Sequence, residues 1–114
     1  AILRTSLGRL FAEAKVKDDS LLAQDEFIRI LIHAAVGRFG VAMEMSIEAI
    51  GECVEDDSDT IDMGYFAEAY NIRMDCDEEL NPFVSENWKI IDTGTALQRY
   101  EDEKPKRRRQ TKKR

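Results

Sequence analysis

Residues 39–54 read FGVAMEMSIEAIGECV, and this stretch decides the fold class. Large apolar side chains recur at close to helical spacing and form one stripe, made of Phe39, Met43, Ile47, Ile50 and Val54. Mostly smaller ones form a second stripe beside it, made of Ala42, Met45, Ala49 and Cys53. We expect both stripes to be buried, which makes residues 39–54 the central and most buried helix.

Two helices are predicted before this stretch from the same periodicity. The first covers residues 3–14. The second begins after Ser20, a preferred N-cap residue, and ends at Val36 before Gly37, because glycine commonly follows a helix. Its expected inward-facing positions are Leu21, Phe27, Ile28, Leu31 and Ala35.

One helix is predicted after the central stretch, over residues 62–74. Asp62 can cap it, and the carboxylate charge suits the positive end of a helix. Ile61 and Phe66 stand at the two positions of a hydrophobic staple. The helix is expected to end near Met74.

The periodicity fails after residue 74. Asn81-Pro82-Phe83 is typical of a turn with an aromatic anchor, and Trp88, Ile90 and Ile91 indicate an extended strap. Residues from Thr93 on show only Leu97 and Tyr100 as larger apolar side chains, and the segment from Glu101 has none, so we expect it to be disordered in isolation. The prediction is an all-α fold of four helices and a strap, with a helical domain at 1–92 and a flexible segment at 93–114.

Charge is divided unevenly along the chain. The net charge of −6 hides a tail, KPKRRRQTKKR, that holds eight of the 17 Lys and Arg, so the nine others face all 23 acidic residues and residues 1–103 carry −14. The tail cations are Lys104, Lys106, Arg107, Arg108, Arg109, Lys112, Lys113 and Arg114. They can neutralise phosphates and so predict salt-sensitive nucleic-acid binding that reads no base sequence. A nuclear localisation signal and a docking arm for an acidic protein are the alternatives.

Metal and nucleophile sites find little support. One His and no close Cys pair exclude a zinc pattern, and His33 is interpreted as a packed or partly exposed helix residue. Cys53 is interpreted as core. The spacing of Asp75, Asp77, Glu79 and Glu86 is similar to a calcium loop, but Leu80 replaces the required glycine, which favours a solvated acidic loop.

The sequence also bears on the cellular compartment and on whether the chain is part of a longer protein. No apolar run of about 18 residues and no signal peptide is present, so we expect no membrane span. Two lone cysteines fit a reducing cytosol. The chain begins Ala-Ile-Leu, and we expect it to be a fragment of a longer protein.

The turn Gly37-Arg38-Phe39-Gly40 joins two helices. Gly40 would let the second helix start close to a neighbouring backbone. Arg38 stands at a helix N-terminus, where a cation is unfavourable, so it would suit a partner anion; the alternative is a solvated loop residue.

Several features in order resemble the C-terminal part of the TniB family of transposon AAA+ ATPases, which are related to TnsC-type regulators. The similarity covers residues 10–83: EFIRIL, the turn Gly37 to Gly40, the AMEMSIEAI pattern, an acidic loop with an Ile-Asp step, FAEAY and NPF. It implies that the chain is the helical lid over a nucleotide held by a separate α/β core. Walker motifs belong to that core, so the resemblance implies no catalysis, no cofactor and no metal in this chain, and ATP with Mg²⁺ in the parent protein.

The same resemblance implies function and partners. TniB-type proteins bind target DNA in an ATP-dependent way and recruit a transposase, in the bacterial cytoplasm at the nucleoid. Many such lids carry a sensor arginine after the glycine turn, where this chain has Val41, Ala42 and Met43; only Arg38 could approximate it. The basic tail would then tether the protein to DNA. The alternative is a free-standing helical interaction adaptor with a nuclear-localisation-like tail.

Overall fold

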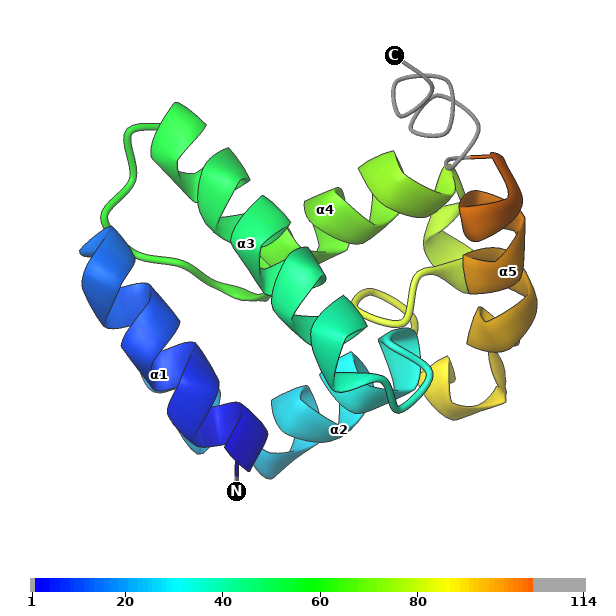
Figure 1. Cartoon of the computed structure of the whole chain (residues 1–114), viewed down its shortest axis with the longest axis horizontal. Coiled ribbons are helices and arrows are strands. Elements are labelled where there is room, and N and C mark those ends of the chain that lie inside the picture. Colours follow the sequence, from blue (N-terminus) through cyan, green and yellow to red (C-terminus); the bar gives the residue numbers. More distant parts are fainter. Residues whose placement is uncertain (1, 104–114) are drawn as a thin grey trace, which may run out of the picture.

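The computed structural model describes residues 2–103, and these form an all-α fold, as predicted (Figure 1). Five α-helices are present in that range, one more than expected. They are α1 (Ile2–Ala14), α2 (Asp25–Ala34), α3 (Phe39–Glu55), α4 (Met63–Met74) and α5 (Thr93–Glu103). Three short 3-10 turns join them, η1 (Leu21–Ala23), η2 (Glu78–Leu80) and η3 (Trp88–Ile90).

Helix α3 is the centre of the arrangement. It packs most extensively against α4 and also contacts α1 and α2, while α5 packs on α4 (Figure 1). The helix predicted over residues 39–54 is therefore confirmed, within one residue at its end.

The expectation that both stripes of α3 are buried is wrong. Ala42, Met45, Ala49 and Cys53 are at most 2% exposed, and we call these four residues the covered side. Phe39, Ile47 and Val54 are 49%, 55% and 54% exposed, and with half-buried Met43 they form the open side. Only Ile50 of the first stripe is buried. Three of the four covered residues are small and let neighbouring helices approach closely, whereas most of the larger stripe is turned outward.

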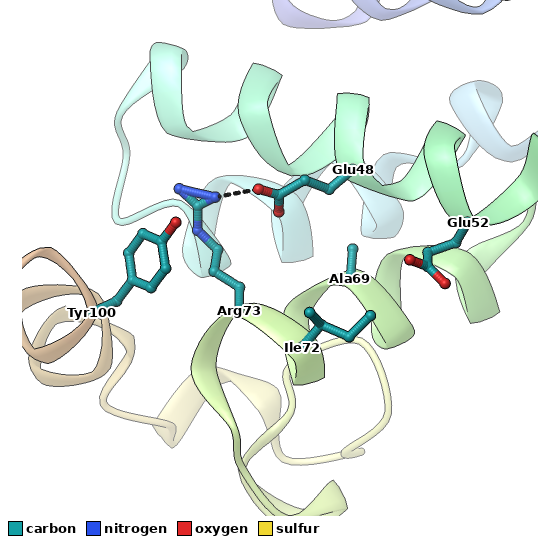
Figure 2. Close-up of a pocket in the computed structure, with 6 residues that line it drawn as sticks. All are labelled: Glu48, Glu52, Ala69, Ile72, Arg73 and Tyr100. Atoms are coloured by element: carbon teal, nitrogen blue, oxygen red, sulfur yellow. Dashed lines mark hydrogen bonds and ion pairs between the residues drawn. The ribbon is translucent and has the colours of Figure 1, made fainter. Parts of the chain in front are cut away.

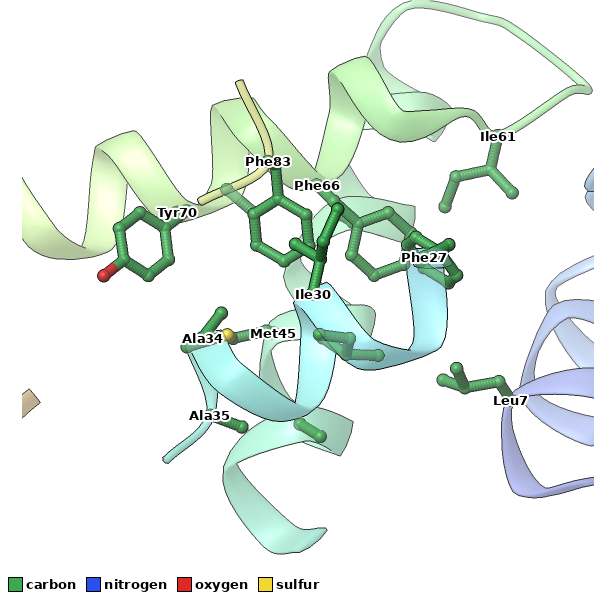
Figure 3. Packing of buried hydrophobic residues seen from close by; sticks show 14 of the residues in the cluster. Leu7, Phe27, Ile30, Ala34, Ala35, Met45, Ile61, Phe66, Tyr70 and Phe83 are labelled. Atoms are coloured by element: carbon green, nitrogen blue, oxygen red, sulfur yellow. The ribbon is translucent and has the colours of Figure 1, made fainter. Parts of the chain in front are cut away.

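An aromatic cluster fills the core between α2, α4 and the turn after η2 (Figure 3). Phe66 lies edge-on to Phe27 with ring centroids 4.9 Å apart, and Phe83 lies 5.7 Å from Phe66 and 6.0 Å from Tyr70. Buried Asn81 fixes the turn, because its Nδ2 donates to Ala67 O at 2.9 Å and its Oδ1 accepts from Phe83 N at 3.0 Å. The predicted aromatic-anchored turn is confirmed.

The second predicted helix is wrong at its start. Ser20 has a left-handed backbone (φ 69°) and its side chain makes no capping bond. Asp18 takes that role instead, accepting from Leu22 N at 3.0 Å, and only the short turn η1 forms before α2 begins at Asp25. The expected inward positions are buried except Ile28, which is half-buried.

Helix α2 ends two residues earlier than predicted, in a Schellman motif. Val36 N donates to His33 O at 3.1 Å and Gly37 N donates to Ile32 O at 2.9 Å, which satisfies two terminal carbonyls. The left-handed position at the end of this helix is therefore held by Val36 (φ 55°), with Gly37 (φ 70°) after it. A β-branched residue in this conformation is strained.

Helix α4 agrees with its predicted bounds. Asp62 caps it, with Oδ1 accepting from Gly64 N at 2.9 Å. The two staple residues, Ile61 and Phe66, are both buried in the core cluster.

The region after residue 87 differs from its prediction. Trp88–Ile90 is a 3-10 turn rather than an extended strap; Trp88 is buried, whereas Ile90 is 83% exposed. The sequence predicts no helix after Thr93 and disorder from Glu101, but residues 93–103 form α5. Asp92 caps α5, because its Oδ1 accepts from Thr95 N at 3.1 Å. The division into domains at residue 92 stays a prediction, and residues 104–114 lie outside the described range.

Among residues 2–103, no single helix is long and apolar enough to cross a membrane. Only α2 and α3 taken together, bent by 109° at their junction, pass such a test by length and composition.

Candidate functional site

Arg73, in the last turn of α4, lies between α3 and α5 (Figure 2). Its side chain is only 3% exposed. Nη2 donates to Glu44 Oε1 at 2.6 Å and Nη1 donates to Glu48 Oε2 at 2.9 Å. The guanidinium carbon lies 4.4 Å from the centre of the Tyr100 ring, a cation–π contact. Arg73 thus joins three helices through one side chain.

The sequence provides this arrangement by simple spacing. Glu44, Glu48 and Glu52 recur every four residues and therefore lie along one side of α3. An arginine near the C-terminal end of α4 is favoured by the helix dipole. One of the three guanidinium nitrogens has no partner, because Arg73 Nε is buried and makes no hydrogen bond among the described residues.

A cavity of about 300 Å³ opens beside Arg73 (Figure 2). Its lining residues are Glu48, Glu52, Ala69, Ile72, Arg73 and Tyr100. A second cavity of about 340 Å³ shares Glu52 and is otherwise lined by Asp56, Asp62, Gly64, Tyr65 and Glu68. We call these two cavities together the acidic groove. Its walls combine carboxylates with apolar and aromatic surface.

The groove has an excess of negative charge. Arg73 pairs with Glu44 and Glu48, but four further carboxylates form no ion pair within residues 2–103: Glu52, Asp56, Asp62 and Glu68. Asp56 accepts a hydrogen bond from Tyr65 Oη at 3.0 Å. The groove therefore suits a cation with an apolar stem and disfavours phosphate.

Arg38, the predicted nucleotide-proximal residue, precedes α3. Its Nη1 lies 3.1 Å from Glu101 Oε2 of α5, and the two side chains are 53% and 38% exposed. Whether Arg38 meets an anion in a larger assembly stays a prediction. The expected close approach at Gly40 is wrong, since no neighbouring atom lies within 4 Å of where a Cβ would stand.

His33 is packed, as interpreted from the sequence. Its Nε2 donates to Ile91 O at 2.9 Å, and its ring lies edge-on to Trp88 with centroids 5.6 Å apart. Thr93 Oγ1 donates to His33 O at 2.7 Å. His33 therefore fastens the start of α5 to α2, which is a structural role.

Neither cysteine has the features of a nucleophile. Burial raises the pKa of the Cys53 thiol, and burial also raises the pKa of Cys76, so both favour the unreactive thiol form. Within the described range, no group of three or more His, Cys, Asp or Glu side chains could hold a metal ion.

Tyr70 is a buried polar group without a partner. Its hydroxyl has none among residues 2–103, and burial raises its pKa to about 12. It borders a cavity of about 210 Å³ between α4 and α5, where Arg99 Nη2 donates to Met74 O at 2.9 Å. This cavity is smaller than the acidic groove and has less net charge.

The predicted and observed sites hardly overlap. The eight tail cations lie outside the described residues, and Arg38 lies on the edge of α3 rather than in the groove. The Arg73 cluster was not predicted from the sequence. The signal that could have indicated it is the four-residue spacing of Glu44, Glu48 and Glu52.

Comparison with known proteins leaves the family open: no family model, no curated protein and no solved structure matches this chain. The resemblance to the TniB family therefore stays a prediction based on the order of sequence features.

Proposed function

We propose that this chain is the helical lid of a TniB-type AAA+ ATPase, which binds target DNA and recruits a transposase. The open side of α3 carries this proposal. Phe39, Ile47 and Val54 are each about half exposed on the helix that follows the glycine turn. A lid must pack on the α/β core that holds ATP and Mg²⁺, and a row of large apolar side chains is suited to such packing.

The length of the row fits an interdomain contact. Phe39 and Val54 are 15 residues apart, or about 22 Å along a helix at 1.5 Å per residue. Interfaces between domains of one chain typically bury about 600–1,500 Å². The chain itself would supply no catalytic group in this proposal, because ATP hydrolysis belongs to the core.

A matched pair of variants tests the lid. In the full gene product, Ile47→Lys introduces a charge on the open side, and Ile90→Lys introduces the same charge on η3. We expect ATP hydrolysis to fall about tenfold or more for Ile47→Lys, because an unpaired charge at an interface costs several kcal/mol, and to stay unchanged for Ile90→Lys. Equal activities for the two variants would contradict the lid.

A free-standing adaptor is the second candidate, because the open side equally fits the surface of a partner protein. Under that function the gene product contains no phosphate-binding GxxxxGK[ST] loop, and Ile47→Lys reduces partner binding without any effect on nucleotide.

The tail supplies the DNA contact in this proposal. Deleting residues 104–114 is expected to weaken binding to duplex DNA and to flatten its dependence on salt. The shortened chain neutralises fewer phosphates, so fewer counterions are released when it binds. Fluorescence anisotropy from about 50 to about 200 mM salt measures both the affinity and its dependence on salt. Unchanged affinity and slope would assign DNA binding elsewhere.

A further inference from the structure

We propose that the basic tail, residues 104–114, docks in the acidic groove of its own chain and there competes with DNA for the same cations. The occupant is argued from four properties: charge, reach, the chemistry of the groove walls, and a buried donor that has no partner. The docking does not depend on the lid, whereas the competition rests on the DNA binding proposed above for the tail.

Charge complementarity is the first argument. The groove carries Glu52, Asp56, Asp62 and Glu68 without an ion-pair partner in residues 2–103. The tail carries eight cations and no acid. No other segment of the chain has a comparable excess of positive charge, since residues 1–103 hold nine cations against 23 acids.

Reach is the second argument. Glu103, the last described residue, lines a cavity that also contacts Arg73 and Tyr100, so the tail leaves α5 at the Arg73 end of the groove. Eleven residues span up to about 36–40 Å when extended. The lining carboxylates from Glu48 to Asp56 cover about 12 Å at the rise of a helix, so the tail is long enough to follow the groove without moving α5.

The groove walls supply the third argument. Ala69, Ile72 and Tyr100 line the first cavity and Tyr65 lines the second, beside the carboxylates. Long Lys and Arg side chains place their methylene stems on such apolar surface while the charged group meets an acid. A simple acidic surface offers only the charge.

Arg73 supplies an independent fourth argument. Its side chain is only 3% exposed and lines the first cavity. Its Nε–H lacks an acceptor among the described residues. A cationic side chain cannot satisfy this donor. A backbone carbonyl of an extended peptide can, but Arg73 Nε has no exposed surface, so the carbonyl meets it only when the Arg73 side chain shifts as the peptide binds.

Docking predicts a competition. If the tail is docked for part of the time, its apparent affinity for DNA equals its intrinsic affinity multiplied by the fraction of chains in which the tail is free. Removing groove charges would therefore strengthen DNA binding, whereas removing equal charges elsewhere would not.

Paramagnetic broadening in the complete chain tests contact directly. A nitroxide at Thr111→Cys, on a Cys76→Ser background, should broaden amides of residues 48–56 and 64–68 more than those of residues 78–86 at 50 mM salt. The difference should vanish at 500 mM salt, because screening weakens the contact. Equal broadening over both regions, or none, would overturn the proposal.

Mixing distinguishes the tail of the same chain from that of a second copy. Isotope-labelled chain without nitroxide is combined with unlabelled, nitroxide-bearing chain. Intramolecular docking predicts no groove broadening in the mixture, and broadening equal to that of the singly labelled chain would contradict it.

A charge-matched DNA titration tests the competition. Glu52→Gln/Glu68→Gln removes two groove charges, and Glu78→Gln/Glu79→Gln removes two exposed charges that line neither cavity of the groove. If the tail is docked about two-thirds of the time, the groove variant should bind DNA more tightly than the control, by up to roughly threefold when docking is abolished. Equal affinities would contradict the competition even if both variants fold normally.

Discussion

The covered side and the open side of α3 are both apolar, but they differ in the size of their side chains. On the covered side three of the four residues, Ala42, Ala49 and Cys53, are small, and only Met45 is large; on the open side Phe39, Ile47 and Val54 are large and about half exposed. The small residues lie where neighbouring helices pack on α3, and the larger ones are left exposed within residues 2–103. Exposed large apolar residues in a row are typical of an interaction surface.

The largest expected effect separates the two sides directly. Met45→Ala, at a 1% exposed position, leaves a cavity and should lower the free energy of unfolding by about 2–5 kcal/mol. Ile47→Ala, two residues away on the open side, should change it by less than about 0.5 kcal/mol. Urea denaturation of the chain measures both. Similar losses would mean that the open side is covered after all.

Arg73 tests whether the contact between α3 and α4 also depends on a buried cation. Arg73→Lys cannot bridge two carboxylates and stack on Tyr100 at once, so we expect a loss of about 1–3 kcal/mol. The control is Arg38→Lys, since Arg38 is in an exposed pair, and its expected change is below about 0.5 kcal/mol. Thermal unfolding of the two variants measures both losses of stability. Equal losses would show that Arg73 stabilises the fold no more than an exposed arginine does.

The core that packs against the covered side should disfavour a charged group. The deprotonation of buried Tyr70 at high pH tests this expectation. Burial raises its pKa to about 12, above the usual 10, so the folded state keeps the proton that the unfolded chain releases. Stability from this group is complete below pH 10 and is lost as pH rises toward 12. Relative to the wild type, Tyr70→Phe should gain about 1 kcal/mol between pH 9 and pH 11.

Urea unfolding of both proteins at the two pH values gives this difference, and comparison at equal pH cancels the titration of other groups. A constant difference between the two proteins would show that Tyr70 titrates normally and is in contact with water.

The smallest expected effect concerns the turn that leads into α3. Val36→Gly relieves the left-handed strain at φ 55° and should stabilise the chain by about 0.5–1 kcal/mol while both sides of α3 stay as they are. Val84→Gly, at an exposed position without positive φ, should instead destabilise. Denaturant midpoints decide, and a loss of stability for both would show that Val36 is not strained.

Sequence reasoning succeeded where local rules agree with packing. The bounds of α3 and α4, the Asp62 cap and the Asn81–Phe83 turn followed from periodicity and capping chemistry. The end of α2 was placed too late because a β-branched residue, Val36, holds a conformation that usually requires glycine.

Other features depended on contacts that no single segment reveals. Helix α5 has few apolar residues, and it is held by Leu97 together with the bonds around His33 and Arg99. Asp92, a preferred N-cap residue, was a local signal for the start of α5, but the prediction relied on apolar periodicity alone. The exposure of Ile47 could not be read from spacing, because spacing orders the sides of a helix without saying which side the rest of the chain covers.

The covered side, the open side and the acidic groove lie at different positions around α3. The first holds the domain together, the second is assigned to a core or partner, and the third to the basic tail. Each assignment has its own variant, so that one can fail without the others.

Reading the gene upstream of Ala1 tests the central claim, the assignment of the open side to an ATPase core, most directly. The lid predicts a GxxxxGK[ST] loop and an acidic Walker B strand within roughly one domain length, about 100–200 residues, in the same reading frame. A start codon immediately before Ala1, or an unrelated upstream domain, would contradict the lid and leave a helical adaptor with a basic tail.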